Sequence, residues 1–111
     1  MYKVGIIGVG VVGHAVYKSL NDKGVDILPY DKYKNIGNFD SMLNTDVVFL
    51  CLPTLYNTEL QSYDKSAVDE VCSLLSKEKY KGLVVIKSTV EPTTSQFFAN
   101  KYGVSIVHNP E

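Results

Sequence analysis

The sequence predicts an α/β domain of the doubly wound type, with a mostly parallel sheet and helices on both faces. Short apolar segments alternate with amphipathic segments of helical period along the whole chain. The apolar segments are nearly continuous, which is typical of parallel strands that are buried on both faces. The 111 residues, of which 45% are hydrophobic and 21% charged, predict a single domain over residues 1–111. The predicted strands span residues 3–8, 25–31, 47–52, 83–87 and 104–107, and the predicted helices span residues 12–23, 66–80 and 93–101.

The first half of the chain predicts strand, helix and strand in that order. Val12, Val16 and Leu20 recur at helical spacing after the first apolar segment. Gly24 follows as the expected C-terminal cap of this helix. The sequence from residue 32 to residue 45 is less regular and predicts a turn and at most a short helix.

The second half predicts two further strand–helix units. Val68, Val71, Cys72 and Leu75 form an apolar stripe at helical spacing. Residues 55–63 are polar and predict a loop. Capping boxes are expected to open both later helices. The two boxes are Ser66 with Asp69 and Thr93 with Gln96.

A glycine-rich turn joins the first strand to the first helix. The segment Gly8-Val9-Gly10-Val11-Val12-Gly13 matches G-x-G-x-x-G in the strand-to-helix context that a dinucleotide-binding motif requires. Gly8 permits the tight turn, Gly10 leaves room for a pyrophosphate beside the backbone, and Gly13 lets the helix pack closely on the strand. The helix dipole favours the phosphate charge. All six residues are therefore candidate cofactor-binding residues of a Rossmann-type domain.

Asp31 lies at the end of the second predicted strand, where a carboxylate can accept hydrogen bonds from the adenosine ribose hydroxyls. Because a carboxylate repels a 2′-phosphate, Asp31 predicts NAD as the cofactor in preference to NADP. All eleven basic residues are lysine, so the chain lacks the arginine that usually binds a 2′-phosphate. Lys32 and Lys34 act in the opposite sense, since a nearby ammonium group offsets the carboxylate charge. The alternative role of Asp31 is that of a strand-end turn residue.

Composition argues against several other classes of protein. The formal net charge is −1 and the lysines are interspersed with acidic residues, so no basic surface for nucleic acid is expected. No apolar segment approaches the roughly 20 residues that a membrane span needs, and no signal peptide is recognised. Cys51 and Cys72 predict two buried thiols in a reducing, cytoplasmic compartment, with neither a metal site nor a disulfide framework.

Three further segments follow predicted strands, at the sheet edge where ligands bind in open α/β folds. They are Leu52-Pro53-Thr54, Lys87-Ser88-Thr89-Val90-Glu91-Pro92 and Asn109-Pro110-Glu111. Together with the glycine-rich turn, these segments resemble the UDP-glucose/GDP-mannose dehydrogenase family over the whole chain. In that family a strand ends in Pro-Thr, a later one in Ser-Thr-Val and the next in Asn-Pro-Glu.

The resemblance implies NAD-dependent oxidation of a nucleotide-sugar C6 alcohol to the acid through a covalent thioester. Thr89 matches the threonine beside the nicotinamide and the reacting carbon. Glu111 matches the glutamate that assists hydrolysis of the thioester. Pro53, Thr54 and Ser88, with Thr89, are the further residues expected to line the cofactor site.

The chain also departs from the family pattern. The catalytic cysteine, the lysine and the sugar-binding domain of the family lie beyond Asn-Pro-Glu, and neither Cys51 nor Cys72 is placed to replace that nucleophile. Glu91-Pro92-Thr93-Thr94 lacks the glycine that usually follows Ser-Thr-Val. We therefore expect no activity from these residues alone, and either self-association or a partner domain.

Two alternatives to this function remain open. The first alternative is a stand-alone NAD(H)-binding module. The second is the cofactor domain of a 6-phosphogluconate or β-hydroxyacid type of dehydrogenase. His14 is expected on the solvent or phosphate side of the first helix, and His108 in a structural role.

Overall fold

A five-stranded parallel sheet forms the centre of the molecule, as a computed structural model shows for residues 3–109. The sheet consists of β1 (Lys3–Ile7), β2 (Asp26–Tyr30), β3 (Val47–Leu50), β6 (Leu83–Ile86) and β7 (Ser105–His108). The helices are α1 (Val11–Asp22), α2 (Ser66–Lys77) and α3 (Thr94–Tyr102). The strand order is β2-β1-β3-β6-β7, so the chain first moves outward from β1 to β2 and then returns to continue on the other side of β1.

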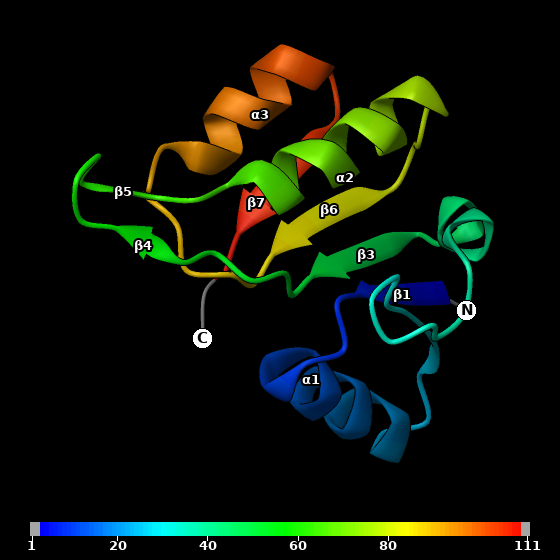
Figure 1. Ribbon diagram of the computed structural model, residues 1–111. Helices are drawn as coiled ribbons and strands as arrows, with labels where there is room; N and C mark the ends of the chain where they lie inside the picture. Colours follow the sequence, from blue (N-terminus) through cyan, green and yellow to red (C-terminus); the bar gives the residue numbers. More distant parts are fainter. Residues whose placement is uncertain (1–2, 110–111) are drawn as a thin grey trace.

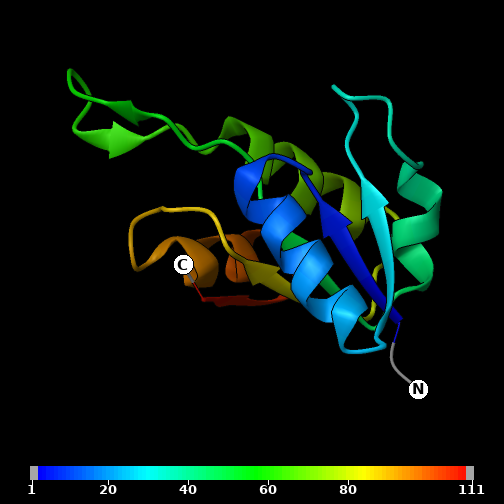
Figure 2. The same ribbon diagram turned by 90° about the horizontal axis from the view of Figure 1, so that it is seen from below.

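The helices form two layers around the sheet. Figures 1 and 2 show α1 on one face and α2 with α3 on the other. Under α1, a small core of Val4, Ile6 and Ile27 packs against Val16 and Leu20 of the helix. The larger core lies under α2 and α3 and includes all four residues of the α2 apolar stripe. This arrangement confirms the predicted Rossmann-type α/β fold with helices on both faces.

The predicted boundaries agree with the observed ones to within two residues, the usual uncertainty of helix and strand ends, except that α2 ends at Lys77 and not near Tyr80. The predicted glycine cap of α1 is also correct, and a second glycine caps α3. Gly24 has φ +78° directly after the α1 C-cap, and Gly103 caps α3 with φ +68°. Both values lie in the left-handed region, where glycine carries no steric cost.

The prediction of a loop over residues 55–63 was wrong. A hairpin of β4 (Tyr56–Asn57) and β5 (Ser62–Tyr63) projects from the body of the molecule (Figure 1). The rings of Tyr56 and Tyr63 meet edge to face with centroids 5.0 Å apart, and Asp64 N–H donates to Leu55 O at its base. Two-residue strands are too short for a periodic pattern, so sequence gave no signal of the hairpin.

Both predicted capping boxes were wrong. Asp64, not Asp69, accepts from the backbone and the hydroxyl of Ser66 at the start of α2. The Asp69 carboxylate instead accepts from Tyr102 Oη and pairs with Lys101, which links α2 to α3. The Asp69 side chain therefore binds Tyr102 and Lys101 of α3 and does not cap its own helix.

The capping box predicted at α3 fails in the same way. Thr93 has helical backbone angles and makes no side-chain cap. Gln96 donates to Asn100 Oδ1 one turn later instead of reaching back to the N-cap.

The segment between β2 and β3 contains no further strand of the sheet among the described residues. Asp31 and Ile36 exchange two backbone hydrogen bonds across a tight turn. A 3₁₀ helix (Phe39–Asn44) follows, and Asn38 caps it by accepting from Ser41 N–H. Within residues 3–109, no helix is long and apolar enough to cross a membrane.

The buried thiol of Cys72 makes stability depend on alkaline pH. Burial raises the pKa of Cys72 from 9.0 to about 12, with a smaller contribution from Asp69. Between these values the unfolded chain loses a proton that the folded chain keeps, so the free energy of unfolding falls as the pH rises. We expect Cys72→Val to reduce this slope above pH 9, as measured by urea unfolding at a series of pH values. Equal slopes for the two proteins would contradict the assignment.

Candidate functional site

The glycine-rich turn brings α1 against the carboxyl ends of β1 and β3. Gly8 has φ +98°, and a Cβ there would lie 2.5 Å from Cys51 O. A Cβ on Gly13 would lie 1.9 Å from Gly8 O. Neither contact is possible for a side chain, so both positions require glycine for close packing.

Gly10 is different, because a Cβ there would meet nothing within 4 Å. It is the N-cap of α1, and the next residue, Val11, is 90% exposed. The first N–H groups of a helix have no partner within the helix, and the first turn of α1 contains no acidic residue. Open space and unopposed backbone donors make this end of α1 suitable for an anion.

Asp31 ties the glycine-rich turn to the end of β2. Its Oδ2 accepts from Val9 N–H at 2.8 Å, and its Oδ1 accepts from the N–H groups of Tyr33 and Lys34 at 3.0 and 3.2 Å. Lys34 also reaches back over the turn, where its Nζ donates to Val9 O at 2.7 Å. These contacts hold the carboxylate in one orientation beside the turn. Lys34 was considered from sequence only for its charge, and its contact with the turn was missed.

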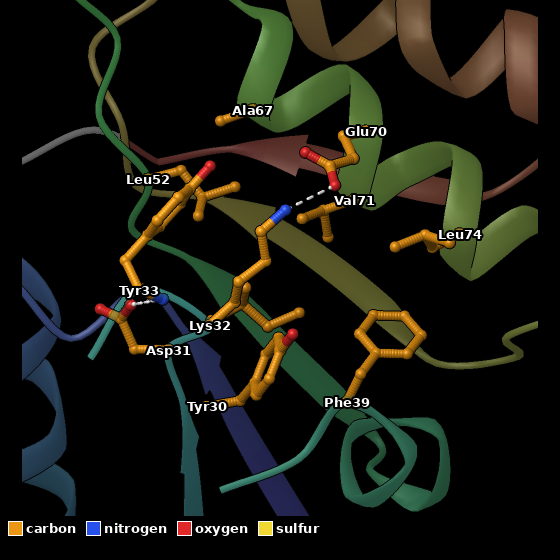
Figure 3. Close-up of a pocket in the computed structure, with 12 residues that line it drawn as sticks. Tyr30, Asp31, Lys32, Tyr33, Phe39, Leu52, Ala67, Glu70, Val71 and Leu74 are labelled. Atoms are coloured by element: carbon orange, nitrogen blue, oxygen red, sulfur yellow. Dashed lines mark hydrogen bonds and ion pairs between the residues drawn. The ribbon is translucent and has the colours of Figure 1, made fainter. Parts of the chain in front are cut away.

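A first pocket lies between the end of β2 and α2, and we call it the β2–α2 pocket. Figure 3 shows its two walls, with Tyr30 to Tyr33 on one side and α2 on the other. Lys32 Nζ and Glu70 Oε1, 3.0 Å apart, join the two walls. The hydrogen bond with Glu70 raises the pKa of Lys32. The pocket is mostly apolar and is lined by Ile7, Gly8, Tyr30, Asp31, Lys32, Tyr33, Phe39, Leu52, Ala67, Glu70, Val71 and Leu74.

A second cavity, which we call the β3–β6 cleft, lies on the other side of the glycine-rich turn. Its volume is about 210 Å³, and it is lined by Val12, Cys51, Leu52, Thr54, Lys87, Ser88 and Thr89. Buried Ser88 donates to Leu52 O at 2.6 Å, and Thr54 Oγ1 donates to Thr89 O at 2.6 Å. These two bonds fasten the loop after β6 to the loop after β3. The side chain of Thr89 is left exposed at the cleft.

The structure brings most of the predicted site residues to this one edge of the sheet. Gly8 and Asp31 border the β2–α2 pocket, whereas Val12, Thr54, Ser88 and Thr89 border the β3–β6 cleft. Leu52 lines both cavities, so they are neighbours.

The remaining predicted residues are placed differently. Pro53 is exposed and lines neither cavity, and Glu111 lies outside the described residues. His14 is exposed on the first turn of α1. His108 has its Nε2 3.1 Å from Ser88 O, a contact that steadies the loop after β6.

Comparison with known proteins supports the fold. No protein-family model and no curated protein matches the sequence. A UDP-glucose dehydrogenase from Pyrobaculum islandicum matches 100% of this chain and 36% of its own, with a TM-score of 0.83 and 19% identity. A GDP-mannose dehydrogenase from Pseudomonas aeruginosa matches 97% of this chain and 36% of its own, with a TM-score of 0.73 and 19% identity.

A third solved structure belongs to the other class of dehydrogenase considered above. The 3-hydroxyisobutyrate dehydrogenase from Mycobacterium tuberculosis matches 99% of this chain and 40% of its own, with a TM-score of 0.77 and 16% identity. At these identities the likeness establishes the fold. This chain therefore spans only about 36% to 40% of the length of these three neighbours.

Gly10 and Gly13 form a matched pair for testing the turn. We expect Gly13→Ala to lower the free energy of unfolding by about 1–3 kcal/mol or more, because its Cβ overlaps Gly8 O. Gly10→Ala should leave stability nearly unchanged, since its Cβ enters open space, yet abolish dinucleotide binding. Urea unfolding and calorimetric titration measure the two effects. Equal destabilisation by both substitutions would show that Gly10 is not an open position.

Proposed function

We propose that this chain is an NAD-binding domain of a dehydrogenase. The observation that carries the proposal is the exposed start of α1 at Gly10, since Gly8 on one side of it lines the β2–α2 pocket and Val12 on the other side lines the β3–β6 cleft. A dinucleotide has the same plan, with a central diphosphate and a nucleoside on each side. The crevice lies where the strand order reverses between β1 and β3, which is the usual ligand position in open α/β sheets.

The adenosine end is assigned to Asp31 and the β2–α2 pocket. The carboxylate of Asp31 is already oriented by three backbone N–H groups, and of its roughly four lone-pair positions one, on Oδ2, is left for a ribose hydroxyl. The apolar walls of the pocket suit the faces of a purine. The carboxylate disfavours a 2′-phosphate, which supports NAD in preference to NADP. Lys34, bonded to the turn, supplies one positive charge near the diphosphate.

The nicotinamide end is assigned to the β3–β6 cleft. Thr54, Ser88 and Thr89 lie on its wall, and the exposed hydroxyl of Thr89 is the group that we assign to the reacting carbon. NAD supplies the hydride acceptor when it is bound. Thr54, Ser88 and Thr89 would orient the nicotinamide ring and exclude water from one side of it. We retain Pro53 as a residue of the strand-end segment and Glu111 as a residue acting on the acyl intermediate.

We propose nucleotide-sugar oxidation as the reaction of the complete enzyme. The order of the Pro-Thr, Ser-Thr-Val and Asn-Pro-Glu segments supports this choice. Oxidation of a β-hydroxyacid is the second candidate, favoured by the likeness to the 3-hydroxyisobutyrate dehydrogenase. Either substrate requires a pocket facing the nicotinamide, which a partner domain or a second copy would complete.

Cofactor choice tests the proposal most directly. We expect saturable binding of NAD and no detectable binding of NADP in calorimetric titrations. Asp31→Asn keeps a hydrogen-bond acceptor but removes the charge, so it should weaken NAD binding and reduce the discrimination against NADP. If neither dinucleotide binds the wild-type chain, the proposal fails. If NADP binds as tightly as NAD, the role of Asp31 in cofactor choice is refuted.

Because hydride transfer needs a complete substrate pocket, we expect the 111 residues to be inactive by themselves. With NAD and UDP-glucose, we expect no formation of NADH above the blank at 340 nm, because hydride transfer requires a substrate held against the nicotinamide face. The control is binding of NAD under the same conditions, which shows that the cofactor site is intact. Measurable turnover would contradict this expectation.

A further inference from the structure

Glu91, a carboxylate outside the predicted site, joins the β4–β5 hairpin to the loop after β6. We call this loop, residues 87–93, the Thr89 loop. Glu91 Oε1 accepts from Lys65 Nζ at 2.8 Å, and Glu91 Oε2 accepts from Tyr63 N–H at 3.1 Å. Lys65 Nζ also donates to Tyr63 O at 3.1 Å. The hydrogen bond from the Lys65 ammonium is the largest cause that lowers the pKa of Glu91 to about 2, so this carboxyl group is ionised at neutral pH.

Residues on both sides of the hairpin contact the Thr89 loop. Thr54, just before the hairpin, donates to Thr89 O, and Tyr63 and Lys65, at its end, bind Glu91. Between the two gripped residues, Val90 is only 6% exposed and is buried in the core. The stretch from Thr89 to Glu91 is therefore held at three consecutive positions, and the side chain of Thr89 faces the cleft.

The side chain of Glu91 itself does not line the β3–β6 cleft. Its partners lie on β5 and just before α2, so any effect on a bound ligand must pass through the backbone of the loop. The chain lacks a glycine after Ser-Thr-Val, and the ion pair is a charge-assisted contact between this loop and the rest of the molecule.

We infer that Glu91 is a positioning residue, which fixes Thr89 against the nicotinamide end of the cofactor through its ion pair with Lys65. This inference rests on the proposed NAD-binding function. It predicts an effect confined to the nicotinamide half of the dinucleotide, because Asp31 and the β2–α2 pocket share no contact with Glu91. A residue needed only for folding would instead affect both halves together.

The test compares NADH with ADP-ribose, which lacks the nicotinamide. Glu91→Gln keeps an acceptor for Tyr63 N–H and loses the ion pair, and Lys65→Gln removes the same pair from the other side. For both variants we expect NADH binding to weaken by about tenfold, the effect of losing one charge-assisted hydrogen bond. The fluorescence of bound NADH should shift toward that of the free molecule. ADP-ribose affinity should stay within about twofold of wild type.

Two controls make the result specific. Glu59→Gln removes the same charge from an exposed site on the hairpin and should change neither ligand's binding. Because both single substitutions remove one and the same pair, the double variant should bind NADH no more weakly than either single variant. Thermal unfolding checks that each variant is folded. If Glu91→Gln does not fold, Lys65→Gln carries the test alone.

The outcomes separate the inference from the proposed function. Unchanged NADH affinity and emission in both variants would overturn the role of Glu91, as would equal weakening of NADH and ADP-ribose. Bound NADH with the emission of the free molecule in the wild type would also overturn it, because the nicotinamide would then not be held. If the wild type fails to bind ADP-ribose, the proposed function itself is refuted.

Discussion

The strand order reverses between β1 and β3, and the positions of the site residues follow from that reversal. Chain segments leave neighbouring strands in opposite lateral directions, so the loops after β1 and β3 diverge and leave a crevice that no connection crosses. Parallel pairing brings the carboxyl ends of all five strands to the same edge. Gly8, Asp31, Thr54 and Thr89 are far apart in sequence, yet each follows a strand, and this edge is where they meet.

Much of this arrangement could be predicted from sequence because it depends on strong local signals. Buried parallel strands produce continuous apolar runs, and the glycine-rich turn has a steric reason at each glycine. The hairpin and the true partners of Asp69 could not be predicted. Two-residue strands have no period, and the choice between a local cap and a distant tyrosine is made by packing. The same limit applies to Lys34 and Glu91, whose roles depend on the distances between loops.

The site is organised before any ligand arrives. Backbone N–H groups orient the Asp31 carboxylate, hydroxyls of Ser88 and Thr54 join two strand-end loops, and none of the described buried side-chain nitrogen or oxygen atoms lacks a hydrogen-bond partner. Such fixed geometry reduces the entropy lost on binding. The chain contains no arginine, so in the proposed dinucleotide site the N–H groups at the start of α1 are the donors assigned to the diphosphate.

The two outer strands of the sheet differ in their capacity to accept another strand. At the β2 edge, Pro29 has no N–H to donate, and Asp31 already exchanges both its backbone bonds with Ile36. At the opposite edge, no described residue pairs with the outer side of β7 (Ser105–His108). Proline and a local turn therefore protect the β2 edge against pairing with another strand, whereas no described residue gives β7 such protection.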